Sequence, residues 1–399
     1  MDFRFSAEDE AFRQEVRDFV QSEWDDRGYD LVSTMNTSWH LDDNAALALQ
    51  HEFEQKLVQK GWWTMHWPKE FGGQDAGIER QLVYREEMAY QGAPSAQGGG
   101  LVAPLLMIHG QDWQKEYFIP RLANAEFEFA QGFSEPNAGS DLGSLTTRAV
   151  ADGDDFVING QKIWTSTAHH PRAKWGHILV RTDPDAAKHR GISYFLIDME
   201  SPGISLRPLY DMLGRRRWSE WFLEDVRIPA QNLVGELNRG WYAAMTTLSF
   251  ERASVDIPAA LLREWEKIVD YLGTTNINGE PFTANPIVRN EMADLRIYVE
   301  LGRMLAYRVA WMQTKGLMPQ AEGSIARVWA GEATQRIFRT GARLMQDMGT
   351  LIPGGPSRWS PMGGYIGANH YLSTGRTFGG GTKEIQRNII AQRGLGLPR

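Results

Sequence analysis

Residues 132–141, GFSEPNAGSD, bring together small and hydroxyl side chains directly after a strand-like run. The backbone N–H groups of such a turn, with the hydroxyls of Ser134 and Ser140, suit the edge of a heteroaromatic ring or an anionic ligand. An ordinary Asx or Ser turn explains the same residues. The stretch therefore predicts a binding segment only if a second stretch with matching chemistry lies beside it.

Residues 162–167, KIWTST, supply such a stretch. Side chains alternate across a strand with a period of two, which predicts that Trp164 and Ser166 lie on one face. An indole beside a hydroxyl can pack on a flat cofactor and form a hydrogen bond with its edge. The alternative is a tryptophan that fills the core.

Residues 249–254, SFERAS, place Glu251 and Arg252 within a helical pattern. A charged pair in a helix is usually a solvated face. The functional alternative is a carboxylate that points into a cleft and acts as a general base. Desolvation would then raise its pKa toward the working pH.

Residues 377–390, TFGGGTKEIQRNII, run three glycines into Thr382 at the start of a predicted helix. N–H groups at a helix N-terminus donate to anions and oxyanions, and glycine lets a ligand approach the backbone. A simple turn between helices is the alternative, although it needs fewer than three glycines.

Several other kinds of chemistry are excluded. The chain has no cysteine, so it forms no disulfide, thiolate metal site or cysteine nucleophile. It has no HExxH and no GxxxxGK[ST] motif, and no strand–helix–strand unit surrounds Gly379 to Gly381. The pair His169-His170 is predicted to lie in a surface turn and not in a metal site.

Charge and hydropathy limit the partners and the location. The net charge of −8 argues against non-specific nucleic-acid binding. The sequence contains no run of about 18 apolar residues, so we expect no transmembrane helix. The N-terminus lacks the apolar region of a signal peptide. We expect a cytoplasmic protein.

The elements that position these stretches follow an α, β, α order. We predict an α+β multidomain protein with a helical domain over 1–126, a β domain over 127–236 and a helical domain over 237–399. Ser6 and Asp9 resemble a capping box, and Gly61 is a predicted C-cap. Asn159-Gly160 predicts a hairpin turn, and Pro258 predicts a kink within one long helix.

Taken together, the motifs resemble the acyl-CoA dehydrogenase family over nearly the whole chain. The matching segments occur in family order and are HWPKEFGG, FSEPNAGSD, INGQKIWTS, FLEDVRIP, LMQDMG and GGGTKEIQRNIIAQRGLGLP. The combination of SEPNAGSD with NGQKIWTS about 20 residues later is the most specific. The family fold has an N-terminal helical domain, a middle β-barrel or sandwich domain and a C-terminal four-helix bundle.

The resemblance implies FAD, an acyl-CoA substrate and reoxidation by an electron-transfer flavoprotein. In this family a glutamate removes the α proton while a hydride leaves the β carbon for flavin N5, which gives a trans-2-enoyl-CoA. Hydrogen bonds to the thioester oxygen stabilise the enolate-like charge.

The resemblance also assigns roles to residues of this chain. The flavin contacts are Gln131, Phe133 and Ser134 at its edge, Trp164 against the isoalloxazine and Ser166 near N5. Thr382 matches a contact to the flavin phosphate, while Gln346 and Gly349 match a segment that touches the adenosine end of FAD in a neighbouring subunit. Ser140 would face CoA, and Arg252 would lie beside the substrate pocket.

The position of the catalytic base departs from the commonest family pattern. Many members carry the glutamate in the last loop, in a pattern like YEGT, where this chain has Gly380. Other members, similar to isovaleryl- and long-chain-type enzymes, carry it on the long helix of the C-terminal domain, where this chain has Glu251. We therefore expect Glu251 to be the base and the Gly380 N–H to donate to the thioester oxygen.

A second departure concerns the FAD diphosphate. Most members bind it with an arginine in an R-x-F-G stretch, but the corresponding region here reads NGEPFTANPIVRNEMADL. Bacterial members that act on steroid side chains form α2β2 assemblies in which two different chains share each FAD. Such a heterotetramer and a homotetramer with another cationic residue both remain open.

Three functions are compatible with these residues. The first is an FAD-dependent acyl-CoA dehydrogenase with Glu251 as base, which Ser140 and Arg252 favour. The second is a flavin monooxygenase or acyl-CoA oxidase of the same fold, in which oxygen reaches the reduced flavin. The third is a structural subunit whose partner carries the base, and the presence of Glu251 argues against it.

Overall fold

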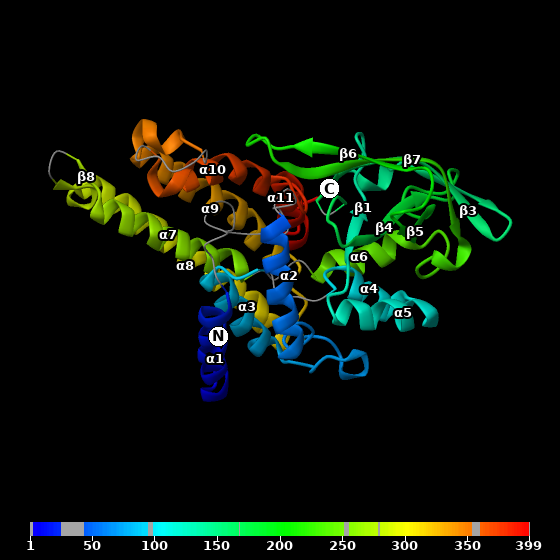
Figure 1. Cartoon of the computed structure of the whole chain (residues 1–399), viewed down its shortest axis with the longest axis horizontal. Coiled ribbons are helices and arrows are strands. Elements are labelled where there is room, and N and C mark those ends of the chain that lie inside the picture. The colour runs from blue at the N-terminus through cyan, green and yellow to red at the C-terminus, as the bar shows by residue number, and fades with distance from the viewer. Residues whose placement is uncertain are drawn as a thin grey trace. The chain divides into compact units, whose positions relative to one another are not determined.

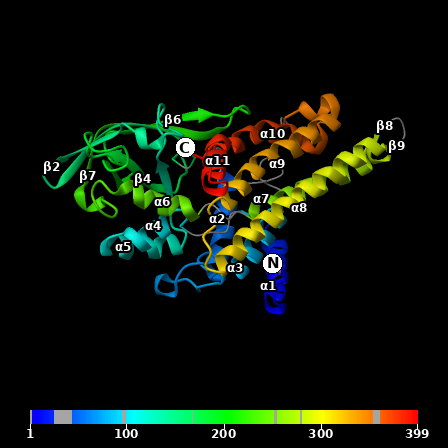
Figure 2. The same ribbon diagram turned by 180° about the vertical axis from the view of Figure 1, so that it is seen from behind.

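The computed structural model describes residues 3–24, 44–94, 99–166, 168–250, 255–277, 280–352 and 360–398. Its elements are helical at both ends of the sequence with a sheet between them (Figures 1 and 2). The chain folds into two compact units. One contains Met1–Thr37, Ala76–Ala96 and Arg252–Arg399, and the other contains Ser38–Asp75 and Gln97–Glu251.

The second of these units, which we call the sheet unit, is built around a seven-stranded sheet of order β1-β4-β2-β3-β7-β6, with β5 paired to β4. Strands β1 and β4 are parallel, whereas β3 and β7 form a long antiparallel pair. The strands are β1 (Glu128–Gly132), β2 (Arg148–Asp152), β3 (Asp155–Thr165), β4 (Ala173–Arg181), β5 (Ile192–Asp198), β6 (Ile204–Tyr210) and β7 (Arg216–Pro229).

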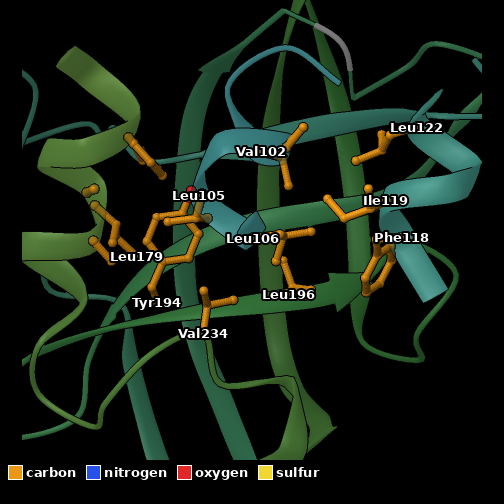
Figure 3. Close-up of a cluster of buried hydrophobic side chains, with 14 of the residues drawn as sticks. Val102, Leu105, Leu106, Phe118, Ile119, Leu122, Leu179, Tyr194, Leu196 and Val234 are labelled. Carbon is orange, nitrogen blue, oxygen red and sulfur yellow. The ribbon is translucent and has the colours of Figure 1, made fainter. Parts of the chain in front are cut away.

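Three helices of the same unit, α4 (Val102–His109), α5 (Asp112–Ala123) and α6 (Gly240–Phe250), pack on the β4–β5 side of the sheet. The unit also contains α2 (Asn44–Gln59). Figure 3 shows Leu105 and Leu106 of α4 and Phe118 of α5 facing Tyr194 and Leu196 of β5, all of them buried. A second core, which includes Ile158, Ile178, Phe195 and Trp221, fills the interior of the curled sheet.

The other unit, the helical unit, is almost entirely α-helical. Its helices are α1 (Ala7–Glu23), α3 (Ile78–Gln91), α7 (Asp256–Thr274), α8 (Pro286–Thr314), α9 (Glu322–Leu344), α10 (Tyr365–Leu372) and α11 (Lys383–Ile389), with a short β8–β9 pair, Asn276–Ile277 and Glu280–Pro281. Apolar residues of α7, α8, α9 and α10 form its main core. The capping interaction predicted at Ser6 is present, because its hydroxyl accepts from the Asp9 N–H at 3.0 Å.

The predicted fold class is confirmed, with helical N- and C-terminal parts and a curled middle sheet. The boundaries at residues 126 and 236 stay a prediction. Among the described residues, no helix is long and apolar enough to cross a membrane.

The hairpin predicted at Asn159-Gly160 is wrong, because β3 runs straight through both residues. The Asn159 side chain instead pairs with Asp225 of β7, accepting from its backbone N–H at 2.9 Å. Gly160 has φ +152, and an added Cβ would lie 2.5 Å from Thr147 Oγ1. Asn159 and Gly160 therefore contact neighbouring chain segments and do not form a turn. The tight turn lies at Gly153, between β2 and β3.

The single helix predicted across Pro258 stays a prediction, because it passes through residues 251–254, outside the described residues. Helix α7 begins at Asp256. Pro258 is the third residue of α7, where a backbone N–H has no partner within the helix, so proline breaks no hydrogen bond there.

Candidate functional site

The two stretches of the sheet unit that carry the predicted flavin contacts lie side by side. The Ile163 N–H donates to the Ser134 carbonyl at 2.9 Å. The Thr165 hydroxyl donates to the Gln131 carbonyl at 2.8 Å. The structure thus brings the segment after β1 against the end of β3, as a shared binding site requires.

Trp164 sits at an irregularity in β3. The register with β7 shifts between Lys162 and Thr165, so the strand contains a bulge there. Trp164 itself has φ +65, which is costly for a bulky side chain, and the residue is 57% exposed. Its indole contacts that of Trp218 edge to face, with centroids 5.8 Å apart. The bulge turns an aromatic plane outward, a common arrangement beside active sites.

This bulge corrects the period of two assumed from the sequence. An unbroken strand would place Lys162 and Trp164 on the same face, yet Lys162 is fully buried and Trp164 is exposed. Ser166 follows the strand and is partly buried. The alternative of a core tryptophan does not apply to Trp164.

A buried ion pair holds the two stretches together. Lys162 Nζ donates to Glu135 Oε1 at 2.8 Å and to the Phe133 carbonyl at 3.2 Å. Glu135 also accepts from the backbone N–H groups of Thr146 at 2.6 Å and Thr147 at 2.9 Å. Three chain segments therefore meet at one carboxylate, and Lys162 links it to the backbone of Phe133.

The surroundings of Glu135 keep it ionised. Burial alone would raise its pKa, but the Lys162 ammonium and the hydrogen bonds from Thr146 and Thr147 lower the pKa to about 2. Burial lowers the pKa of Lys162, against the raising field of Glu135. Each charge depends on the other, because an unpaired charge at this depth is strongly destabilising.

Gln131 and Phe133 present different groups to the site. Phe133 is buried, and its ring packs edge to face on His177 and Tyr194, so only its backbone is available for a ligand. The Gln131 amide nitrogen is buried and has no hydrogen-bond partner among the described residues. A buried donor without a protein acceptor, beside an outward-facing indole, fits the polar edge and flat face of a flavin.

Ser140 lies in an exposed turn of the same unit. Its neighbour Asp141 forms an ion pair with Lys188 at 2.6 Å, which ties this turn to the loop between β4 and β5. Ser140 is therefore accessible, as a contact to CoA requires.

The glycine loop belongs to the helical unit. Gly380 and Gly381 have φ values of +66 and +94, a region that disfavours other residues. Thr382 caps α11, since its hydroxyl accepts from the Ile385 N–H at 3.2 Å. The Thr382 side chain is thus already used by the helix, and a ligand contact there would be shared with the cap.

Gln346 and Gly349 lie at the opposite end of α9. Gly349 is buried, and an added Cβ would lie 2.1 Å from the Ala342 carbonyl. Gln346 is exposed with φ +55. The loop at Gly380 packs near Arg327, whereas α9 ends at Leu344, 17 residues later and roughly 25 Å along the helix axis. These two segments therefore lie far apart along α9.

The predicted base Glu251 and its neighbour Arg252 lie outside the described residues.

The His169-His170 pair was predicted to lie at the surface, but His170 is buried, and burial lowers its pKa to about 4. Among the described residues, no group of His, Asp and Glu side chains has the arrangement of a metal site.

Sequence reasoning missed Lys162 and Glu135. Lys162 is separated from Glu135 by 27 residues, so no local pattern connects them. A lysine among apolar residues of a strand is the one available signal, since buried lysines are rare unless paired.

Comparisons with known proteins cover the whole chain. Models of the acyl-CoA dehydrogenase N-terminal, middle and C-terminal domains match residues 6–126, 130–226 and 238–395. Acyl-CoA dehydrogenase FadE26 of Mycobacterium tuberculosis is 33% identical, with 100% of this chain and 99% of that protein covered.

The alignments with two solved structures span 100% of this chain and 100% of each solved chain. The structure titled Tcur3481-Tcur3483 steroid ACAD has a TM-score of 0.87 at 30% identity. The ChsE4-ChsE5 complex from Mycobacterium tuberculosis has a TM-score of 0.84 at 31% identity.

Proposed function

The chain belongs to the acyl-CoA dehydrogenase family, whose members are FAD-dependent oxidoreductases, and we propose that it converts an acyl-CoA thioester to the trans-2-enoyl-CoA. Two observations carry this proposal: Trp164 faces outward, and the buried Gln131 amide nitrogen has no hydrogen-bond partner among the described residues. Both belong to the segments that the sequence assigned to a flavin.

In this proposal the chain's residues bind FAD and the acyl-CoA, orient them, and remove the α proton of the acyl group. FAD, when bound, supplies the acceptor for the hydride that leaves the β carbon. Trp164 supports the flat ring system, and the Gln131 amide and Ser166 hydroxyl donate to its polar edge. Glu251 removes the α proton, and the Gly380 N–H donates to the thioester oxygen as negative charge develops there.

The buried pair Lys162–Glu135 has a positioning role. It fixes the carbonyl of Phe133, and through it the backbone on which Ser134 and Gln131 are displayed. Preorganised donors stabilise charge better than donors that must reorient during the reaction.

We also propose that the active assembly contains a second, related chain. The missing R-x-F-G arginine and the two-chain names of the solved structures support this proposal. Electron-transfer flavoprotein is the proposed acceptor of the electrons. The name of one solved structure includes a steroid substrate class, so a ring-bearing acyl group is the first to test.

An anaerobic screen of acyl-CoA thioesters tests the reaction. Linear, branched and steroid side-chain thioesters are mixed with the flavin-loaded protein, and bleaching of the oxidised flavin is followed. We expect bleaching and an enoyl-CoA product with at least one of them. The same reaction in air tests the alternative, because an oxidase or monooxygenase would release peroxide or hydroxylated product at the rate of turnover.

A further inference from the structure

A second tryptophan stands beside Trp164 on the neighbouring strand. Trp218 lies near the start of β7, opposite Leu209 of β6, and is partly buried. Its indole meets that of Trp164 at an interplanar angle of 87°, with ring centroids 5.8 Å apart. Edge-to-face contact of this kind is one of the arrangements that aromatic pairs prefer. It uses only part of the Trp164 surface, since that residue remains 57% exposed.

The backbone around the pair keeps the two indoles together. Thr165 and Ser219, which directly follow the two tryptophans, face each other in the register of β3 with β7. The φ of +65 at Trp164 persists only where its surroundings impose it. Within the part of the chain that the structure describes, Trp218 is the one aromatic ring in contact with Trp164. Trp218 is therefore the side chain best placed to fix the orientation of the outward-facing indole.

Arg217 supports Trp218 from the turn between β6 and β7. Its guanidinium carbon lies 5.0 Å from the centroid of the Trp218 ring, within the range of a cation–π contact. Arg217 is buried, and its Nη1 lies 4.0 Å from Asp211 Oδ2. The other Asp211 oxygen accepts from the backbone N–H groups of Leu213 at 2.8 Å and Arg215 at 3.1 Å. The cation beside Trp218 is thus held by a turn that the same carboxylate closes.

We propose that Trp218 is a positioning residue, which holds the Trp164 indole in the orientation that contacts the isoalloxazine ring of FAD. This inference rests on the proposed function, because that function assigns Trp164 to the flavin. Without the edge contact, the Trp164 side chain gains rotamer freedom, which FAD binding then has to remove. Trp218 acts through Trp164 and lowers the entropy cost of binding the cofactor.

Far-ultraviolet circular dichroism tests the contact between the two indoles without any flavin. Indoles this close couple their electronic transitions, which gives a paired positive and negative band. We expect Trp164→Phe and Trp218→Phe each to remove this pair of bands, and the double variant to match either single one. Tyr210→Leu is the control, since Tyr210 is an exposed aromatic residue on β6. A spectrum that neither tryptophan substitution changes would overturn the contact.

A double-mutant cycle on FAD affinity tests the positioning role. The deflavinated protein is titrated with FAD, with its partner chain present if the site needs one. We expect Trp218→Leu to weaken FAD binding about three- to tenfold, as loss of an aromatic pair predicts. Trp218→Phe should retain most of the affinity, and Tyr210→Leu all of it. In a Trp164→Leu background, Trp218→Leu should cause no further loss.

Two results would overturn the positioning role. One is an unchanged FAD affinity in Trp218→Leu, and the other is an equal loss with and without Trp164, which would mean that Trp218 only supports the fold. Trp218→Met gives the same test if the leucine variant does not fold. A wild-type protein that binds FAD but oxidises no acyl-CoA would remove the proposed reaction, while the cycle would still decide the role of Trp218.

Discussion

Lys162 illustrates how a single residue links the sequence motif to the site. The motif around it was recognised by its tryptophan and serine, yet its buried ammonium determines where the Phe133 carbonyl lies. That role depends on Glu135 and on the backbone N–H groups of Thr146 and Thr147, which no local sequence pattern connects to Lys162. Side chains of the site could be predicted from the sequence, but the contacts that position them required the fold.

His177 gives a prediction for stability at acid pH. Its ring is fully buried against Tyr194, and burial lowers its pKa to about 3. The unfolded chain gains a proton near pH 6.5, whereas the folded chain does so only near pH 3. The free energy of unfolding should therefore fall as pH drops below about 6.5, by up to about 1.4 kcal/mol per pH unit for this group.

Urea unfolding at pH 7, 6 and 5 measures this effect. His177→Asn keeps a polar group beside the Tyr194 hydroxyl but does not titrate in this range, so its stability should change less with pH. His170 contributes a similar dependence, which the variant retains. An identical pH dependence in wild type and variant would rule out His177 as a source.

At the scale of elements, β3 departs most from the sequence prediction. Its alternation was recognised, but Asn159-Gly160 was assigned to a hairpin because that dipeptide favours one locally. The hydrogen bonds between Asn159 and Asp225 and the close approach of Thr147 to Gly160 override that preference. The bulge at Trp164 could not be predicted either, because it depends on the register with β7.

Gly160 gives a prediction at this scale. An added Cβ would lie 2.5 Å from Thr147 Oγ1 and 2.7 Å from Thr147 Cα, so the backbone has to move. Gly160→Ala should lower the free energy of unfolding by about 1–3 kcal/mol, as overpacking does. Denaturant unfolding of Gly273→Ala is the control. That glycine lies in α7 with no atom near its added Cβ, so alanine should stabilise the protein by roughly 0.4–1 kcal/mol. An equal effect of both substitutions would contradict the packing argument.

At the scale of the whole molecule, the order of helical and sheet regions was predictable, because hydrophobic periodicity changes from helical to strand-like and back. The partner was not predictable from periodicity. Helix α8 has an apolar face that suits a partner chain: Ile297, Leu301 and Met304 follow at spacings of four and three and are 69%, 48% and 38% exposed. Contiguous exposed apolar surface is typical of an interaction site.

The proposed second chain predicts the flavin content of this chain alone. Expressed by itself, the protein should purify with clearly less than one FAD per chain, because a partner completes the site. Co-expression with a related chain should restore the content, as measured by flavin absorbance against protein concentration. One tightly held FAD per chain, in an assembly of four identical chains, would argue against a different partner.

Flavin reduction by Glu251→Gln tests the central claim most directly. The variant is mixed anaerobically with the acyl-CoA that bleaches the wild-type flavin, and the bleaching rate is followed by stopped flow. FAD content and acyl-CoA affinity are measured in parallel. Glu280→Gln, an exposed glutamate in β9, serves as the control. We predict that Glu251→Gln retains FAD and acyl-CoA but reduces the flavin about 10⁴-fold more slowly, because the α proton has no acceptor. Bleaching by the variant at a rate near that of the wild type would contradict the account.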